Sequence, residues 1–117
     1  MTTHKEKILI IDDEQEMLNN CRRILERFGY RCQILQESNK FSQVFQEDPP
    51  DLILTDLRMP KKGGIDILKE AKKLAPEVVV LLFTAFGTIE SAIKACKLGA
   101  FDYRKQNYQK YSLSNFS

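Results

Sequence analysis

The stretch Ile8-Leu-Ile-Ile-Asp-Asp13 decides the fold. Its four consecutive aliphatic residues predict a strand that is buried on both faces, because a half-exposed strand would alternate apolar and polar side chains. Two similar continuous apolar runs follow at 52–55 and 78–83. Two further stretches, at 30–35 and 100–103, also predict strands but are less continuously apolar. Strands of this kind belong to parallel sheets that are covered by helices on both sides.

Helical stretches separate these strands. Apolar residues recur at helical spacing in four places: 14–28, 39–46, 65–74 and 89–98. The alternation of strands and helices predicts right-handed βαβ units. We therefore predict an α/β fold, a flavodoxin-like, doubly wound parallel sheet of five strands in the order 2-1-3-4-5. The apolar residues after Tyr103 do not form a convincing helical stripe, so the sequence leaves open whether a final helix or a disordered end follows.

Composition and charge restrict the classes of function. The 117 residues fit one domain, and a net charge of +2 argues against a dedicated nucleic-acid-binding protein. The three cysteines have neither the spacing nor the histidine partners of a zinc site, and they favour a reduced, cytoplasmic protein. The longest apolar run has six residues, far short of the roughly 20 that span a bilayer, so we expect no membrane contact.

Three carboxylates are predicted to meet at one edge of the sheet. Asp12 and Asp13 follow the first strand, and Asp56 follows the strand that is expected next to it. Two unit charges about 4 Å apart repel by roughly 4 kcal/mol at an effective dielectric constant of about 20, so a cation is expected to relieve the cluster. Oxygen ligands suit Mg²⁺, and a carboxylate beside Mg²⁺ can attack phosphorus to form an acyl phosphate. The hydroxyl of Thr84, at the end of the next strand, could donate to a phosphoryl oxygen.

Each of these residues also has a simpler interpretation. Asp12 or Asp13 could cap the helix that follows the first strand. Asp56 could belong to a turn, and Thr84 could be an ordinary strand-end hydroxyl. The functional interpretation therefore depends on the joint arrangement, in which all of these side chains are expected at the same edge of one sheet.

Five short motifs resemble the receiver domain of bacterial two-component response regulators. They are Ile10-Ile-Asp-Asp-Glu14, Thr55-Asp-Leu-Arg-Met-Pro60, Gly64, Thr84-Ala-Phe-Gly87 and Lys97-Leu-Gly-Ala-Phe-Asp-Tyr103. The resemblance covers about residues 5–103, most of the chain. The last two motifs look most like receivers of the NtrC type, which regulate sigma-54 transcription.

The resemblance implies a magnesium-dependent phosphoryl site. Asp56 would be the phosphoacceptor and would also contribute to the metal site. Asp13 would bind Mg²⁺ directly, Asp12 would act through a water molecule, and the backbone carbonyl of Arg58 would be a further ligand. The implied cofactor is Mg²⁺, and the implied phosphodonor is a histidine kinase.

The same resemblance implies a conformational switch. Thr84 would contact the phosphoryl group and shift toward it, Ala85 would leave room for that group, and Tyr103 would rotate inward when Thr84 moves. The chain would control transcription through an output domain that it does not itself contain, without direct nucleic-acid contact. It would catalyse at most its own phosphorylation and dephosphorylation.

The chain departs from the family after Tyr103. The family has a lysine three residues after this aromatic, where the sequence has Gln106, and Lys105 comes one residue early. A shift of one residue along a strand turns the side chain to the other face. We therefore divide the chain into a receiver core at 1–103 and an atypical tail at 104–117. A tail that left the last strand uncovered would expose apolar surface and favour a homodimer.

Other functions stay open at this point. Because the expected lysine is replaced, the chain could be a pseudo-receiver, which uses the same fold as a phosphorylation-independent protein-interaction module. It could also be a phosphotransferase or phosphatase with Asp56 as a transient nucleophile, but the sequence offers no cap domain and no placed acid. A flavodoxin-type FMN-binding protein shares the fold. It would need a phosphate-cradling loop after the first strand, where this chain has Asp12-Asp13-Glu14.

Overall fold

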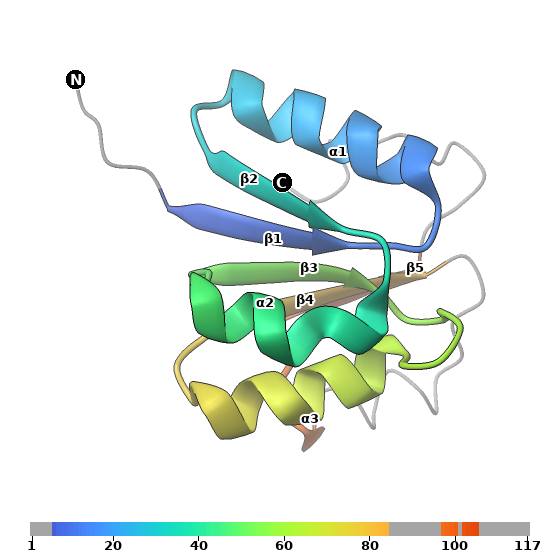
Figure 1. Cartoon of the computed structure of the whole chain (residues 1–117), viewed down its shortest axis with the longest axis vertical. Helices are drawn as coiled ribbons and strands as arrows, with labels where there is room; N and C mark the ends of the chain where they lie inside the picture. Colours follow the sequence, from blue (N-terminus) through green and yellow to red (C-terminus); the bar gives the residue numbers. More distant parts are fainter. Residues whose placement is uncertain (1–5, 85–96, 101, 106–117) are drawn as a thin grey trace.

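The computed structural model describes residues 6–84, 97–100 and 102–105. Five parallel strands form one sheet in the order β2-β1-β3-β4-β5 (Figure 1). The strands are β1 (Lys7–Ile11), β2 (Arg31–Leu35), β3 (Leu52–Asp56), β4 (Val79–Thr84) and β5 (Asp102–Lys105). The fold class and the strand order that the apolar runs predict are therefore confirmed.

Helices connect the strands. They are α1 (Gln15–Arg27), α2 (Phe41–Glu47), which follows the short 3-10 helix η1 (Ser38–Lys40), and α3 (Gly64–Leu74). Figure 1 shows α1 alongside β2, and α2 next to α3. Among the helices that the structure describes, none has the length and apolar character needed to cross a membrane. Most of the helix predicted at 89–98, and everything after Lys105, lies outside the described residues.

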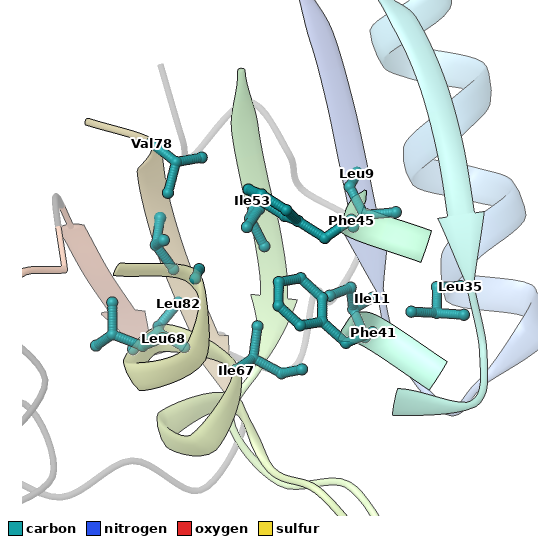
Figure 2. Close-up of a cluster of buried hydrophobic side chains, with 12 residues drawn as sticks. Leu9, Ile11, Leu35, Phe41, Phe45, Ile53, Ile67, Leu68, Val78 and Leu82 are labelled. Carbon is teal, nitrogen blue, oxygen red and sulfur yellow. The ribbon is translucent and has the colours of Figure 1, made fainter. Parts of the chain in front are cut away.

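Side chains from the two faces of the sheet form two separate cores. Figure 2 shows the larger one, in which side chains of α2 and α3 meet those of β1, β3 and β4. The rings of Phe41 and Phe45, both on α2, lie 5.5 Å apart between their centres. On the other face, Leu18 and Cys21 of α1 pack against alternate residues of the same three strands. Both faces are thus buried, which explains why the strands are unbroken apolar runs in the sequence.

The last strand begins two residues later than predicted. The apolar pattern placed it at 100–103, whereas the structure has it at Asp102–Lys105. Gly99 adopts φ 102°, in the left-handed region that favours glycine and commonly follows a helix. Leu98 and Ala100 then pack against the larger core as part of the connection. Ala100, the first residue of the predicted strand, therefore packs in the connection before β5 begins.

The first strand begins one residue earlier than predicted, with a lysine whose side chain is buried. The Nζ of Lys7 lies 2.8 Å from Oδ2 of Asp48 and donates to the backbone carbonyl of Asp48 at 2.6 Å. The backbone N–H of Lys7 donates to the carboxylate of Asp51 at 2.8 Å. These contacts tie the start of β1 to the turn before β3, at the opposite end of the strands from Asp12 and Asp13.

We expect Phe41 to contribute far more to stability than Phe28. Phe41 is fully buried, whereas Phe28 is 75% exposed. Removal of a buried phenylalanine ring costs roughly 3–5 kcal/mol, because it leaves a cavity. In urea unfolding, Phe41→Ala should therefore lose about 3 kcal/mol or more, and the matched control Phe28→Ala less than about 0.5 kcal/mol. Equal losses would mean that α2 does not pack on the sheet as described.

Candidate functional site

The register of β1 and β3 brings three carboxylates to one edge of the sheet. Ile11, the last residue of β1, lies beside Thr55. Asp12 therefore follows β1 at the level of Asp56, the last residue of β3. One carboxylate oxygen from each of Asp12, Asp13 and Asp56 lies within 4.8 Å of the other two. The structure thus brings together the three side chains that the sequence places at this edge.

Asp12 is the most buried of the three, with 3% of its surface exposed. Its Oδ1 accepts a hydrogen bond from the backbone N–H of Glu14 at 2.9 Å. Glu14 occupies the N-cap position of α1 and makes no side-chain capping bond itself. Asp12 therefore bonds within the turn from β1 into α1, and the simpler interpretation, in which Asp12 or Asp13 is the helix cap, is wrong because Glu14 occupies that position. Asp13 and Asp56, in contrast, both reach solvent.

Burial raises the pKa of two of these carboxyl groups. The pKa of Asp12 rises to about 8, mainly because burial disfavours its charged form, although the bond from Glu14 lowers it. The pKa of Asp56 rises to about 6, again mainly through burial. The negative charge of Asp13 adds to the rise at both groups. The cluster is therefore charged only at a free-energy cost, which a bound cation would remove.

Backbone contacts hold the turn that follows Asp56. The N–H of Leu57 donates to the carbonyl of Phe83 on β4 at 2.9 Å, and the N–H of Gly64 donates to the carbonyl of Leu57 at 2.8 Å. The N–H of Arg58 points to Oδ1 of Asp56 at 3.5 Å. A Cβ on Gly64 would lie 2.5 Å from the carbonyl oxygen of Asp56. Only a residue without a side chain fits the start of α3 beside Asp56.

Thr84 and Lys105 end neighbouring strands at the same edge. Thr84 is the last residue of β4 and lies beside Lys105, the last residue of β5. Asp56 lies beside Phe83. The backbone of Thr84 therefore stands one residue beyond the level of Asp56, on the adjacent strand.

The other predicted switch residues fall partly within the described chain. Tyr103 lies in β5 beside Leu82. Ala85 and Gln106 lie outside the residues that the structure describes. The structure thus locates the backbone of Tyr103 and leaves the roles of all three residues as predictions.

The donor atoms of the cluster fit a hard divalent cation. All three side chains offer oxygens, and Mg²⁺ typically binds one or two carboxylates while it keeps several water molecules. Asp13 and Asp56 reach solvent, so a cation between them would retain access to water. Arg58, two residues after Asp56, is exposed in the same turn.

Comparison with known sequences decides the family. Residues 8–114 match the response regulator receiver domain. The chain belongs to this family. The match includes β1 from Ile8 onward, the other four strands and the three clustered carboxylates, so the resemblance seen in the sequence motifs is confirmed. This places the receiver in two-component signal transduction.

The relatives and one of the similar solved structures indicate the subtype. The transcriptional regulatory protein ZraR of Escherichia coli (strain K12) is 35% identical over 103 residues, which make up 88% of this chain and 23% of ZraR. The crystal structure of a receiver domain from Clostridium thermocellum is 37% identical with a TM-score of 0.81, covering 93% of this chain and 90% of that one. The solution structure of the beryllofluoride-activated NtrC4 receiver domain dimer is 26% identical with a TM-score of 0.84, covering 94% and 88%. The receiver is thus NtrC-like, and it spans less than a quarter of the length of ZraR.

Sequence reasoning missed two polar residues that contact the loops of the site. The amide of Gln36 donates to the backbone carbonyl of Asp13 at 3.0 Å. The buried hydroxyl of Ser38 donates to the backbone carbonyl of Pro60 at 3.3 Å. Both residues follow β2, which ends in none of the clustered carboxylates. A serine close to the start of a helix is usually interpreted as a cap, so the sequence gives no signal for either contact.

We expect Gly64→Ala to destabilise the receiver and distort the end of β3. The added Cβ would lie 2.5 Å from the carbonyl oxygen of Asp56 and 2.8 Å from Cδ2 of Leu82. Overpacking of this kind typically costs about 1–3 kcal/mol. Urea unfolding measures the loss. Gly63→Ala provides a graded comparison with a smaller expected loss, because its Cβ would lie 3.0 Å from the carbonyl oxygen of Leu57. Wild-type stability in Gly64→Ala would contradict the described packing.

We expect the metal-free receiver to lose stability as the pH rises from about 4 to about 8. Folded Asp12 and Asp56 have pKa values of about 8 and about 6, whereas an ordinary aspartate has 3.8. The folded state therefore holds protons that the unfolded state has already released. This stabilising contribution is fully present below about pH 4 and falls by at most about 1.4 kcal/mol per pH unit for each carboxyl.

Urea unfolding in EDTA at several pH values measures this dependence, and Asp12→Asn isolates the contribution of Asp12. The difference in stability between the variant and the wild type should grow with pH in favour of the variant. Mg²⁺ should stabilise the wild type more at pH 8 than at pH 5, because it competes with protons for the same oxygens. A difference that stays constant over this range would contradict the described burial of Asp12.

Proposed function

We propose that the chain is a phosphoaccepting switch in which Asp56 takes a phosphoryl group from a histidine kinase. The observation that carries this proposal is the cluster of Asp12, Asp13 and Asp56, whose oxygens lie within 4.8 Å of one another at one sheet edge. Asp56 combines a place in this cluster with access to solvent. The NtrC4 receiver, a similar structure, is activated by beryllofluoride.

Each carboxylate has a separate proposed role. Asp13, Asp56 and the backbone carbonyl of Arg58 would hold Mg²⁺, and Asp12 would act through a bound water molecule. Mg²⁺, when bound, offsets the negative charge of the carboxylates and of the phosphoryl oxygens. Asp12 also accepts a hydrogen bond from the backbone N–H of Glu14. This bond would hold the Asp12 carboxylate in a fixed orientation within the cluster.

The proposed reaction is transfer of the phosphoryl group from a histidine nitrogen to a carboxylate oxygen. An oxygen of Asp56 attacks phosphorus, the bond between phosphorus and nitrogen breaks, and an acyl phosphate forms. The attacking group must be the carboxylate. With a pKa of about 6, Asp56 is mostly deprotonated at neutral pH even without a cation. The chain thus needs no separate general base for this step.

We propose that phosphorylation of Asp56 is transmitted to the rest of the receiver by three residues: Thr84, Ala85 and Tyr103. The backbone of Thr84 lies one position beyond the level of Asp56 on the next strand, within the edge that would receive the phosphoryl group. Tyr103 lies on the strand that pairs with β4. A shift of Thr84 toward the phosphoryl group would therefore act on the connection between β4 and β5.

Two residues compete for the place of the family's lysine. Gln106 has the position of the family's lysine relative to Tyr103 but not its charge, whereas Lys105 has the charge but lies one residue earlier. Lys105 ends β5 beside Thr84, so the lysine reaches the same sheet edge as the carboxylates along the backbone. The backbone of Lys105 thus ends at this edge, we propose that Lys105 or Gln106 takes the place of the family's lysine, and nothing observed favours the pseudo-receiver alternative.

The wider setting follows from the same proposal. A histidine kinase would supply the phosphoryl group, and an output domain or its partner proteins would receive the signal and regulate transcription, as the name of ZraR suggests for that relative. The NtrC4 receiver forms a dimer, and we propose a homodimer here as well. The expected compartment is the cytoplasm. Catalysis would be limited to the receiver's own phosphorylation and dephosphorylation.

Incubation with acetyl phosphate and Mg²⁺ tests the proposed function. Intact-mass spectrometry should show the gain of one phosphoryl group in the wild type and none in Asp56→Asn. Asp66→Asn is a matched control, because Asp66 is an exposed aspartate in the first turn of α3, and it should be phosphorylated like the wild type. If the wild type and Asp56→Asn gave the same mass, phosphoacceptance would be refuted and the pseudo-receiver alternative would replace it.

A further inference from the structure

Ser38 is a buried polar residue that the proposed reaction does not use. Only 3% of its surface is exposed. Its hydroxyl donates to the backbone carbonyl of Pro60 at 3.3 Å, which is long for a hydroxyl donor. Pro60 is its only hydrogen-bond partner among the described residues, and a buried hydroxyl without a partner is destabilising. The bond joins the segment after β2 to the turn after β3, which carries Arg58.

Gln36, two residues earlier, makes a similar contact to the other loop of the site. Its side-chain amide donates to the backbone carbonyl of Asp13 at 3.0 Å. Glu37, between the two, forms an ion pair with Lys40 at 3.0 Å. Lys40, and to a smaller extent Lys61 in the turn after β3, lower the pKa of Glu37. Three consecutive residues thus interact with the two loops that surround the carboxylate cluster.

The turn after β3 contains a residue in an unfavourable backbone conformation, so contacts from outside the turn are needed to hold it. Lys61 adopts φ 70°, a left-handed conformation that is unfavourable for a residue with a side chain. The carbonyl of Pro60 accepts a second bond, from the N–H of Lys62 at 2.8 Å. The ammonium of Lys62 also pairs with Glu70 of α3 at 2.7 Å. The bonds to Pro60 and the pair with Glu70 therefore hold a strained turn on both sides of Lys61.

We propose that Gln36 and Ser38 position the two loops that carry the metal ligands, so that the segment after β2 sets the affinity of the site for Mg²⁺. The inference rests on the proposed function, because it requires that the carboxylate cluster binds Mg²⁺. Neither side chain is one of the proposed ligands of the cation. Each is a positioning residue that acts through a backbone carbonyl, that of Asp13 or that of Pro60.

Mg²⁺ titrations of Ser38→Ala and Gln36→Ala test the proposal. The dissociation constant is measured from the amide NMR shifts of residues 12–14 and 57–59, and the stability of each variant is measured separately by urea unfolding in EDTA. Ser38→Ala should raise the dissociation constant about tenfold, the lower end of the losses seen when groups that orient metal ligands are removed. Gln36 is exposed, so Gln36→Ala should fold like the wild type, and it should raise the constant by a smaller factor than Ser38→Ala does.

The control variants are Ser42→Ala, at a half-buried position, and Gln43→Ala, at an exposed one, both in α2, the helix that follows Ser38. The hydroxyl of Ser42 has no hydrogen-bond partner among the described residues, and Gln43 bonds only to Glu47 within α2 as far as the structure describes. Both controls should bind Mg²⁺ like the wild type. If Ser38 had only a structural role, Ser38→Ala would be less stable than the wild type in EDTA but would have the same dissociation constant for Mg²⁺. That result would overturn the proposal. Ser38→Thr, which retains the hydroxyl, should bind Mg²⁺ more tightly than Ser38→Ala.

Asp13→Asn distinguishes failure of the positioning role from failure of the proposed function. If the wild type binds Mg²⁺ and Asp13→Asn does not, while Ser38→Ala and Gln36→Ala both bind like the wild type, only the positioning role is refuted. If the wild type and Asp13→Asn show the same shifts with Mg²⁺, the cluster is not the metal site, and both the proposed function and the positioning role are refuted.

Discussion

The parallel pairing of β1 with β3 is the constraint on which the site depends. Both strands run in the same direction and end at the same level, so the residues that follow them must share one edge of the sheet. Asp12, Asp13 and Asp56 are brought together by this register and not by any attraction among themselves. The raised pKa values of Asp12 and Asp56 show the opposite of attraction, since burial and like charge both oppose their ionisation.

The remainder of the fold has to hold these opposing groups in place. Apolar side chains fill both faces of β1, β3 and β4, and burial of this kind is the main favourable contribution to folding. The close approach of Gly64 to the carbonyl of Asp56 lets α3 begin directly beside the cluster. A site that costs stability in its free form is suited to a switch, because the binding of a cation or the transfer of a phosphoryl group changes the free energy of the same few groups.

The sequence predicts the sheet and the carboxylate cluster well, and for a physical reason. Strands that are buried on both faces must be continuously apolar, as 8–11 and 52–55 are, and residues after parallel strands must meet at one edge. The start of β5 was predicted wrongly because Ala100, counted as its first residue, is apolar for packing in the connection rather than in the strand. The burial of Lys7 had no signal either, since its partner Asp48 is 41 residues away in the chain.

Contacts such as those of Gln36 and Ser38 belong to a class that sequence patterns do not reveal, because their acceptors are backbone carbonyls and carry no residue identity. Carboxylates that repel one another cannot hold their own loops together, so the relative position of the loops must come from groups outside the cluster. The side chains of Gln36 and Ser38 carry no titratable group, and their bonds go to the backbone carbonyls of Asp13 and Pro60, not to the carboxylates. A charged residue in either place would couple the geometry of the loops to the titration of the cluster. Neutral donors after β2 instead keep the two loops in register while the charge between them changes.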